Sequence, residues 1–359
     1  PEPPKNPNKM GTFLALTKDL SGLQTLTMDH NQISLAAIDI GSNAIRLIVA
    51  RYHERREPEV IEEIRYPLRL GQDSFKKGKL SSSTAKKFIE GIEKLLKVAH
   101  KLDAKAIRAV GTSALREASN SAEVLKKIDS KTGLKIDIVD GQEEAELIHT
   151  AVSRVFSLQD KKAFLMDIGG GSVEAILSDN EHIKFAESLP FGTVRLLHLC
   201  GSDASYKKYQ EHIKPMVTEL LETHLTMQEI GPKDLFVGTG GNLRCLGKLT
   251  ERLLGSNHRN HFTQDELDAL IDLLFSTSCE KRQSHFGLKK DRSDVILPAA
   301  VIVSEFLKGM DLKDVLVPKV GIKNGLIWQM ALELHKSRAE NQKRFSPVRL
   351  GMPHALGLA

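Results

Sequence analysis

The sequence predicts an α/β protein with two similar domains, and three observations carry this prediction. Candidate strands and helices alternate along the chain, which is the pattern of α/β folds. A peptide with an apolar run, an aspartate and a small-residue turn occurs twice, at residues 37–43 and 165–172. The length of 359 residues is sufficient for two domains of ordinary size. We therefore expect a duplicated domain with a ligand held between the two copies.

The first half is expected to alternate strands and helices after a polar, proline-rich N-terminal extension over residues 1–32. Ser81 and Thr84 are typical of a helix start, and Phe88, Ile92 and Leu95 recur at helical spacing after them. Short apolar runs predict the strands. The expected elements are a β-hairpin over 33–52, a strand over 60–70 ending at Gly71, a helix over 80–102, strands over 106–110 and 135–139 with a helix over 122–128 between them, and a helix that begins near Glu143.

The second half restarts at Lys162 with the repeated hairpin, and apolar periodicity again separates helices from strands. The expected elements are a helix over 216–227, a strand over 234–237, helices over 264–275 and 298–307, a strand over 315–317 and a last helix over 324–334. The residues that follow are basic and rich in proline and glycine, so we expect a tail with little structure.

Composition excludes several classes of protein. Charged residues make up 27% of the chain and the formal net charge is +5, which permits an anionic ligand without requiring one. Aromatic residues at 5% are too sparse for a nucleic-acid stacking surface, so no nucleic-acid partner is expected. Cys200, Cys245 and Cys279 are too widely spaced for a zinc site or a disulfide framework. No stretch resembles a signal peptide or a membrane helix, so we expect a cytoplasmic protein without a membrane partner.

The two repeated turns are suited to phosphate. Glycine allows close approach of the backbone, and successive N–H groups supply partial positive charge. Asp39 and Asp167 stand beside the two turns, where a carboxylate suits a hydrated Mg²⁺. A third glycine cluster follows another apolar strand. The candidate phosphate-binding residues of the three turns are Gly41, Ser42, Asn43, Gly169, Gly170, Gly171, Ser172, Gly238, Thr239, Gly240 and Gly241.

Further candidates come from two segments of the first half. Thr112, Ser113 and Arg116 follow a strand, and their hydroxyl and guanidinium groups match phosphate oxygens. Glu143 and Glu144 lie at the start of a helix, where a carboxylate either favours the helix dipole or orients a water molecule for phosphoryl hydrolysis. Spacing does not distinguish between the two glutamates.

Two basic clusters occur in the second half, and most such clusters are solvated surfaces. They matter only for a ligand that is a long polyanion, to which each nearby cation adds affinity that salt weakens. The clusters are Lys207, Lys208, His212 and Lys214, and Lys281, Arg282, His285, Lys289, Lys290 and Arg292.

Five motifs, taken together in this order, resemble the exopolyphosphatase / guanosine pentaphosphate phosphohydrolase (Ppx/GppA) family of the actin-like ATPase superfamily. The resemblance covers roughly residues 33–334 and implies two ribonuclease-H-like α/β domains with an interdomain cleft. The motifs are Asp39-Ile40-Gly41-Ser42-Asn43, Gly111-Thr112-Ser113-Ala114-Leu115-Arg116-Glu117-Ala118, Gly141-Gln142-Glu143-Glu144-Ala145, Asp167-Ile168-Gly169-Gly170-Gly171-Ser172 and Gly238-Thr239-Gly240-Gly241.

The resemblance also implies domain boundaries. The expected division is an N-terminal extension over 1–32, a first domain over 33–156 onto which a C-terminal helix over 320–336 packs back, a second domain over 157–319, and a tail over 337–359.

The resemblance implies roles for individual residues. Glu144 corresponds to the residue that activates water, and Asp167 and Glu174 match acidic catalytic and metal positions around the second turn. We expect Asp167, Glu144 and Asp39 to hold Mg²⁺, and Arg116 to act as a catalytic cation. Asp39, Ser42, Asn43, Arg116, Gly169, Gly170, Gly171 and Ser172 match phosphate-loop positions.

The sequence departs from the family pattern in two places. Val173 stands where threonine is usual after the glycine run, which removes a hydroxyl near the phosphate. The chain also ends soon after the core, without the C-terminal helical domain of long members, so high processivity is not implied.

The implied activity is Mg²⁺-dependent hydrolysis of the terminal phosphoanhydride bond of inorganic polyphosphate, with release of orthophosphate. Guanosine pentaphosphate is the other candidate substrate, and the order of the two stays open, as does the choice between monomer and homodimer. The alternatives are an actin-like or sugar-kinase-type ATP-binding protein and a non-catalytic nucleotide sensor, against which the glutamate pair argues.

Overall fold

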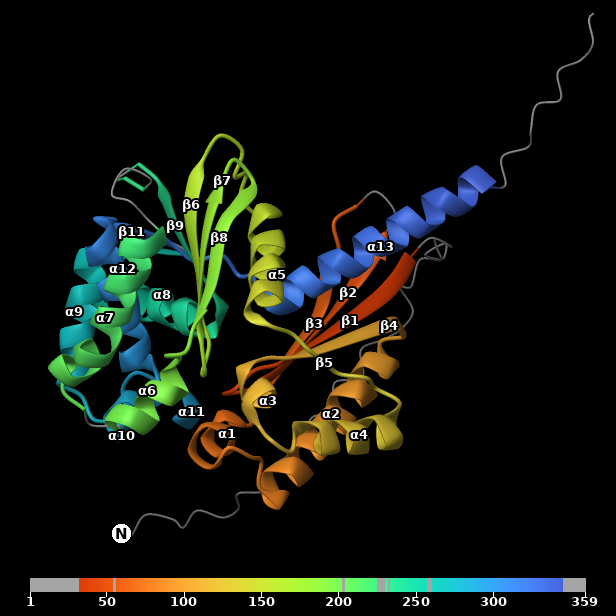
Figure 1. The fold of residues 1–359 in the computed structure, drawn as a ribbon, viewed down its shortest axis with the longest axis horizontal. Coiled ribbons are helices and arrows are strands. Elements are labelled where there is room, and N and C mark those ends of the chain that lie inside the picture. The colour runs from red at the N-terminus through yellow and green to blue at the C-terminus, as the bar shows by residue number, and fades with distance from the viewer. Residues whose placement is uncertain are drawn as a thin grey trace, which may run out of the picture.

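The computed structural model describes residues 32–344 except 54–55, 202–203, 225–229, 232 and 257–259, and the N-terminal extension before residue 32 lies outside this part. Two β-sheets stand side by side, with helices on their outer faces and the helices α5 and α13 between them (Figure 1). The predicted α/β class with two domains is confirmed.

The first sheet has the strand order β3-β2-β1-β4-β5. Strands β1 to β3 form an antiparallel meander, and β4 and β5 run parallel to β1. The elements of this half are β1 (Gln32–Ile40), β2 (Ile45–His53), β3 (Glu59–Tyr66), α1 (Gly71–Lys77), α2 (Ser82–Lys101), β4 (Ala104–Gly111), α3 (Ser113–Glu117), α4 (Ser121–Thr132), β5 (Asp137–Ile138) and α5 (Gly141–Ser153).

The second sheet has the order β10-β11-β9-β6-β7-β8. Strands β6 to β8 form an antiparallel meander, β9 runs parallel to β6, and β11 runs parallel to β9. The elements are β6 (Lys162–Ile168), β7 (Val173–Asp179), β8 (His182–Leu189), α6 (Thr193–Cys200), α7 (Tyr206–His224), β9 (Leu235–Thr239), α8 (Gly240–Leu254), β10 (His261–Thr263), α9 (Gln264–Phe275), α10 (Cys279–Ser284), α11 (Lys290–Ser293), α12 (Ile296–Met310), β11 (Asp314–Leu316) and α13 (Ile322–Arg344).

The two sheets share one topology. Read from the outer strand of each meander, the order is β3-β2-β1-β4-β5 in the first and β8-β7-β6-β9-β11 in the second, with the same strand directions. The duplication expected from the two similar peptides therefore extends to the whole five-strand unit. The hairpins β1-β2 and β6-β7 occupy equivalent places in the two halves.

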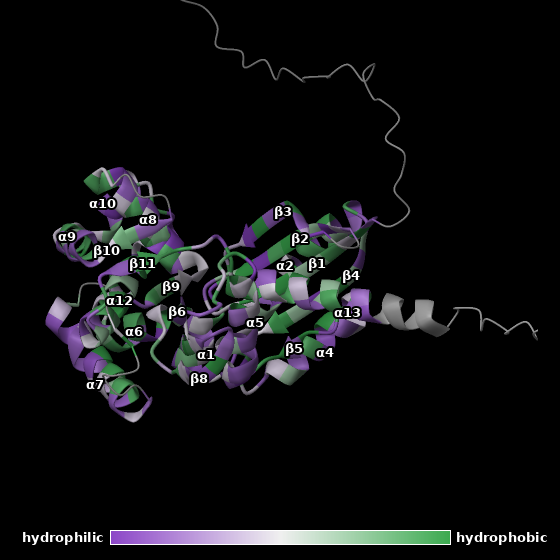
Figure 2. Cartoon of the chain, turned by 90° about the horizontal axis from the view of Figure 1, so that it is seen from above, coloured by the Kyte–Doolittle hydropathy of each residue, from purple (hydrophilic) through white to green (hydrophobic). Residues whose placement is uncertain are grey.

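Three hydrophobic cores hold the layers together. One lies between the first sheet and α2 and α4, and another between the second sheet and its outer helices. The third is shared, because α5 and α13 fill the space between the sheets and receive side chains from both. Seen from above, β1 and β2 are largely hydrophobic, whereas the outer helices mix hydrophobic and hydrophilic residues (Figure 2). Helix α13 packs against α5, β1 and β2.

The last helix is longer than the sequence analysis expected. Helix α13 runs to Arg344, so eight residues of the segment 337–359, predicted to be an unstructured tail, are helical. The extension contains no proline or glycine and consists mainly of residues with high helix propensity, such as Ala339, Gln342 and Lys343. Residues 345–359 lie outside the described part of the chain.

Other boundaries differ for physical reasons. Strand β3 ends at Tyr66 rather than near residue 70, because Pro67 has no N–H to continue the ladder, and Gly71 instead begins α1. Helix α7 begins ten residues before the predicted start and contains Pro215. Apolar side chains at helical spacing on both sides of that proline are buried, so packing outweighs the local cost. Helix α8, which begins within the third glycine cluster, was not predicted.

Within the described ranges, no helix combines the length and apolar character needed to cross a membrane.

The contact between α5 and α13 generates a stability prediction. A Cβ atom on Gly325 of α13 would lie 2.1 Å from the carbonyl oxygen of Leu147, so the two backbones meet without room for a side chain. Gly325→Ala should therefore lower the free energy of unfolding by about 1–3 kcal/mol, which urea denaturation would measure. The control is Gly247→Ala in α8, where the added Cβ would meet only Phe262 at 3.7 Å. Because alanine is the better helix former, this control should be neutral or stabilising, and equal losses in both variants would contradict the prediction.

Candidate active site

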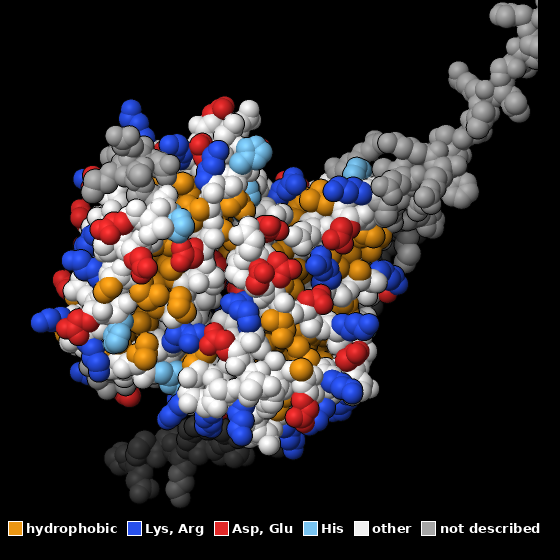
Figure 3. Space-filling model, viewed as in Figure 1, with side chains coloured by type: hydrophobic (Ala, Val, Ile, Leu, Met, Phe, Trp, Pro, Cys, Tyr) orange, Lys and Arg blue, Asp and Glu red, His pale blue; other side chains and the backbone are white. Residues whose placement is uncertain are grey.

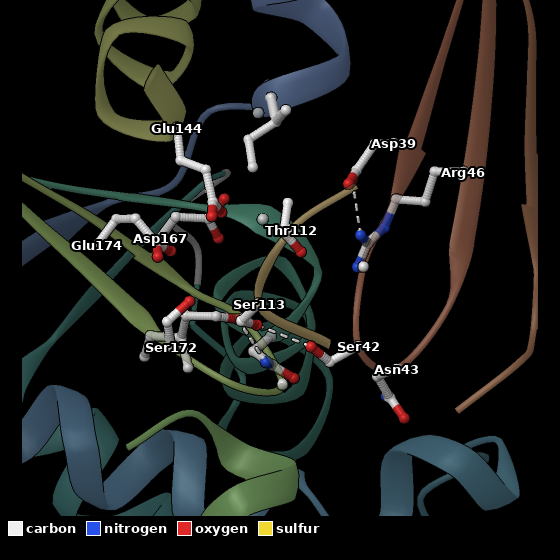
Figure 4. Close-up of a pocket in the computed structure, with 18 of the residues that line it drawn as sticks. Asp39, Ser42, Asn43, Arg46, Thr112, Ser113, Glu144, Asp167, Ser172 and Glu174 are labelled. Atoms are coloured by element: carbon white, nitrogen blue, oxygen red, sulfur yellow. Dashed lines mark hydrogen bonds and ion pairs between the residues drawn. The ribbon is translucent and has the colours of Figure 1, made fainter. Parts of the chain in front are cut away.

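A cleft opens where the two halves meet, and most of the predicted site residues line it (Figure 4). Its walls come from the turns of both hairpins, the loop after β4, and the first turns of α5, α8 and α13. The predicted residues that line it are Asp39, Gly41, Ser42, Asn43, Thr112, Ser113, Glu144, Asp167, Gly169, Gly170, Ser172, Glu174 and Gly240.

The two hairpin turns have equivalent geometry and touch each other. Each is closed by a backbone hydrogen bond, from Gly41 to the carbonyl of Ala44 at 3.1 Å and from Gly169 to the carbonyl of Ser172 at 3.0 Å. A Cβ atom on Gly170 would lie 3.0 Å from the Cβ of Ser42, so glycine leaves room for this close approach. The turns of the two halves therefore form one continuous floor.

The backbone of the second turn is oriented by α6. The carbonyl oxygens of Gly169, Gly170 and Gly171 accept hydrogen bonds from backbone N–H groups at the start of that helix, over residues 192–195. The N–H and C=O groups of a trans peptide point in opposite directions. The amides that follow these carbonyls therefore point away from α6, on the side where Gly170 and Ser172 line the cleft. This arrangement is suited to an anion.

Hydroxyl groups lie beside the turns. Ser42 Oγ is 2.9 Å from Ser113 Oγ, so the first turn and the loop after β4 present paired hydroxyls (Figure 4). Thr112 Oγ1 donates to the carbonyl of Ile40 at 3.4 Å, which ties that loop to the end of β1. Both segments are thereby held at one edge of the cleft.

The equivalent hairpins carry different charges at the same place in the ladder. Asp39 faces Arg46 across β1 and β2, and the two form an ion pair of 2.9 Å. At the matching position of the second hairpin, Asp167 faces Glu174. The first hairpin is thus neutral at this point, whereas the second places two carboxylates together.

Glu144 joins this acidic pair from α5, as Figure 4 shows. It is 2% exposed, and Arg116 Nη1 donates to its Oε1 at 2.9 Å. Glu143 instead points outward and completes a capping box with Asp140, with hydrogen bonds of 2.9 and 3.0 Å. Burial therefore distinguishes the two glutamates that spacing could not. A Cβ atom on Gly141 would lie 2.4 Å from Ser188 Cβ, so glycine allows α5 to approach β8 this closely.

Burial and mutual repulsion raise the pKa values of all three carboxyl groups. Burial is the largest cause for Glu144, whose pKa is raised well above its ordinary range, with the Glu174 charge adding to it. Burial, then the Asp167 charge, raises the pKa of Glu174 to about 7. Burial raises the pKa of Asp167 to about 6 although the Arg46 charge opposes it. Negative charge is therefore under-compensated at this end of the cleft.

Cations also line the cleft, and the sequence analysis did not assign them to the site. Arg46, Arg244, Arg292 and Lys323 line it, each from a different element. Arg292 had been grouped with a basic cluster, but its guanidinium donates to the side-chain oxygen of Asn242 inside the cleft. Burial lowers its pKa to about 10. For Arg46, the sequence did contain a signal that could have assigned it to the site. Its position in the first hairpin is equivalent to that of Glu174 in the second.

Several predicted residues lie outside the lining. Arg116 does not line the cleft, and its guanidinium donates to Glu144 and to the carbonyl of Val139. A Cβ atom on Gly171 would lie 2.3 Å from Phe75 Cζ and Ser113 Oγ, and one on Gly238 would lie 2.3 Å from the Leu243 side chain, so both glycines serve packing. Gly241 and Thr239 flank Gly240, and Thr239 is fully buried.

Val173 and the other basic cluster residues lie away from the cleft. Val173 is buried in the core of the second half, so the absent hydroxyl does not face the cleft. Lys207 and Lys214 are exposed residues of α7. Arg282 is buried and donates to the carbonyls of Leu274 and Ser293. On the face drawn in Figure 3, basic and acidic side chains are mixed over both halves.

The donor set fits a hard divalent cation. In the part of the chain that the structure describes, no three His, Cys, Asp or Glu side chains converge to hold a metal ion by themselves. Mg²⁺ does not need such a cage, because it commonly uses one or two carboxylates together with water and substrate phosphates. Asp167 and Glu174 offer oxygen donors where negative charge is in excess, whereas Asp39 is already paired with Arg46.

The raised pKa values predict how metal-free protein responds to pH. Because Asp167 and Glu174 bind protons more tightly when folded than when unfolded, their contribution to stability is present below pH 4 and is lost as pH rises through 6 and 7. The free energy of unfolding in EDTA should therefore fall by roughly 1–3 kcal/mol between pH 5 and 8. Urea denaturation measures this, and Glu174→Gln should flatten the decline. A wild-type stability that rises over this range, with no change in slope in the variant, would contradict the prediction.

The chain is similar in sequence and fold to several known proteins. The exopolyphosphatase 1 of Mycobacterium tuberculosis is 28% identical over 298 residues, covering 82% of this chain and 87% of that protein. The guanosine-5'-triphosphate,3'-diphosphate pyrophosphatase of Aeromonas hydrophila is 23% identical, covering 87% of this chain and 62% of that protein. The crystal structure of an exopolyphosphatase from Cytophaga hutchinsonii has the same fold, with a TM-score of 0.73, 21% identity and coverage of 84% of this chain and 98% of that one. A sequence model of the Ppx/GppA phosphatase family matches residues 48–334, and the chain therefore belongs to that family.

Proposed function

We propose that the chain is a Mg²⁺-dependent phosphoanhydride hydrolase. Its substrate is the end of an inorganic polyphosphate chain, from which it releases orthophosphate, and guanosine pentaphosphate is its second substrate. The names of the Mycobacterium and Aeromonas relatives support both substrates. The glutamate on α5 supports hydrolysis over the kinase-type alternative, in which phosphate passes to an acceptor other than water.

The observation that carries the proposal is the position of Glu144. Its carboxylate is buried in a cleft whose floor consists of glycine turns suited to phosphate. Arg116 donates a hydrogen bond to this carboxylate. Burial increases its affinity for a proton, which is the property that a general base needs. Surface glutamates such as Glu143 lack this environment.

The chain's own residues account for each step. The turn amides and the Ser42 and Ser113 hydroxyls bind the terminal phosphate. Glu144 accepts a proton from a water molecule, whose oxygen forms a bond to the terminal phosphorus as the anhydride P–O bond breaks. The leaving phosphate chain keeps the electron pair of that bond, and cations that line the cleft, among them Arg46, stabilise its charge.

Asp167, with Glu174 beside it, would hold the metal ion. The ion, when bound, neutralises phosphate oxygens and lowers the cost of charge that develops on them. Asp39 could join through its Oδ1, since Arg46 binds the Oδ2 atom at 2.9 Å.

Glu144→Gln tests the base. Glutamine keeps the size and the contact with Arg116 but cannot accept the proton, so turnover of polyphosphate should fall by about 10² or more while binding persists. Released orthophosphate measures turnover. Glu143→Gln is the matched control, because that residue caps α5 at the surface, and it should stay near wild-type activity. Loss of activity in the control with retention in Glu144→Gln would assign the base to the neighbouring residue.

Asp167→Asn tests the metal site. A neutral amide is a poorer ligand for a hard cation, so the Mg²⁺ concentration that gives half-maximal rate should rise about tenfold or more. A Mg²⁺ titration of the initial rate measures this, with Asp179→Asn at the far end of β7 as the control. An unchanged titration and an unchanged rate in Asp167→Asn would leave that residue without a metal role.

A further inference from the structure

One end of the cleft is more cationic than the binding of a single terminal phosphate requires. Lys323 at the start of α13 and Arg244 on α8 both line this end, and Arg46 lies near them. The Lys323 side chain is only 3% exposed, and that of Arg244 is 23% exposed. Bringing like charges together away from water is costly unless an anion compensates them.

Among the described residues, Glu63 is the carboxylate that contacts both cations of this pair. Glu63 of β3 reaches to 3.3 Å from Lys323 Nζ and 3.8 Å from Arg244 Nη1. Both separations exceed the roughly 2.7–2.9 Å of a tight charge-assisted hydrogen bond. Glu63 is also 43% exposed, so it can turn into solvent without leaving a buried charge.

The other anions near this end do not complete the compensation. Asp39 is in an ion pair with Arg46 at 2.9 Å, and the Asp167 charge acts on Arg244, although no ion pair joins those two side chains among the described residues. Lys323 has one further polar contact, to Asn324 Oδ1 at 3.1 Å, and that oxygen is uncharged. Burial, and then the Arg244 charge, lower the pKa of Lys323, whereas Glu63 opposes this only in part. An added anion would therefore stabilise both cations.

We propose that Arg244 and Lys323 form a subsite for the phosphoryl group next to the one that is hydrolysed, and that Glu63 is the resident counter-ion which this group displaces. The inference rests on the proposed function, because it assumes that a phosphate chain enters the cleft. Its ligand class is a phosphoanhydride chain, either inorganic or at the 5′ end of a nucleotide.

The subsite has a consequence for specificity. Orthophosphate occupies only the floor of the cleft and does not reach Lys323. A chain of two or more phosphates reaches it and must displace Glu63. Glu63 thus lowers the affinity for phosphate chains without affecting the affinity for orthophosphate. Lys323 and Arg244 raise the affinity for phosphate chains.

The test measures binding in a Glu144→Gln background, which limits turnover, by isothermal titration calorimetry with Mg²⁺. The ligands are orthophosphate, tripolyphosphate and guanosine pentaphosphate. Adding Lys323→Met should weaken tripolyphosphate binding about tenfold or more, since one charge-assisted contact is lost, and leave orthophosphate within about twofold. Adding Glu63→Gln should tighten tripolyphosphate binding about threefold or more, because the competing carboxylate is removed. Lys248→Met, an exposed lysine one turn along α8 from Arg244, is the matched control and should change neither affinity.

Each outcome distinguishes the subsite from the proposed function. Equal losses for orthophosphate and tripolyphosphate in Lys323→Met, or no tightening in Glu63→Gln, would overturn the subsite while the function stands. Absence of binding of all three ligands by the parent variant would overturn both. A loss with guanosine pentaphosphate that matches the loss with tripolyphosphate would show that both kinds of chain use the subsite. The half-exposed Glu63 keeps the test valid if Lys323→Met fails to fold, which thermal melting would reveal.

Discussion

The burial of three carboxylates at one point is the constraint on which the rest of the site depends. Glu144, Asp167 and Glu174 come from a helix and two strands, and each is at most 8% exposed. Their mutual repulsion needs a compensating positive charge. The Arg116 guanidinium supplies part of it through its hydrogen bond to Glu144. The negative charge that remains favours a bound cation at this end of the cleft. The cations that line the cleft favour a bound phosphate. Substrate and metal ion would together neutralise both kinds of charge.

The duplicated hairpin carries different charges in its two copies. Both copies keep the small-residue turn, but the residue opposite the aspartate is Arg46 in one and Glu174 in the other. The halves meet at the cleft, and each contributes both signs of charge, with Glu144 and Arg46 from the first half and Asp167 and Arg244 from the second. Arg69 maintains this contact through hydrogen bonds to both carboxylate oxygens of Asp294, at 2.6 and 2.9 Å. Because the binding floor includes both turns, separation of the halves would dismantle it.

Much of the fold could be predicted from the sequence because its signals are local. The apolar runs around each turn specify the two hairpins, and the spacing of Phe88, Ile92 and Leu95 specifies α2. The glycine turns and the acidic residues beside them could also be recognised as a phosphate site. The predicted start of α7 was wrong because packing outweighs the local cost of Pro215 inside the helix. Helix α8 was missed because it starts in a glycine run, at Gly240.

What the sequence by itself determined is the α/β class, the duplication and the positions of the two small-residue turns, since each depends on neighbouring residues. Spacing along the chain did not distinguish Glu143 from Glu144, and the tertiary structure shows that Glu144 is the buried one, because burial depends on which side of α5 faces β7 and β8. It also brought Arg244 and Lys323 into the cleft beside Glu63, although these residues are far apart along the chain. Charge compensation between distant segments has no local signature, so it arises only when the two halves pack together.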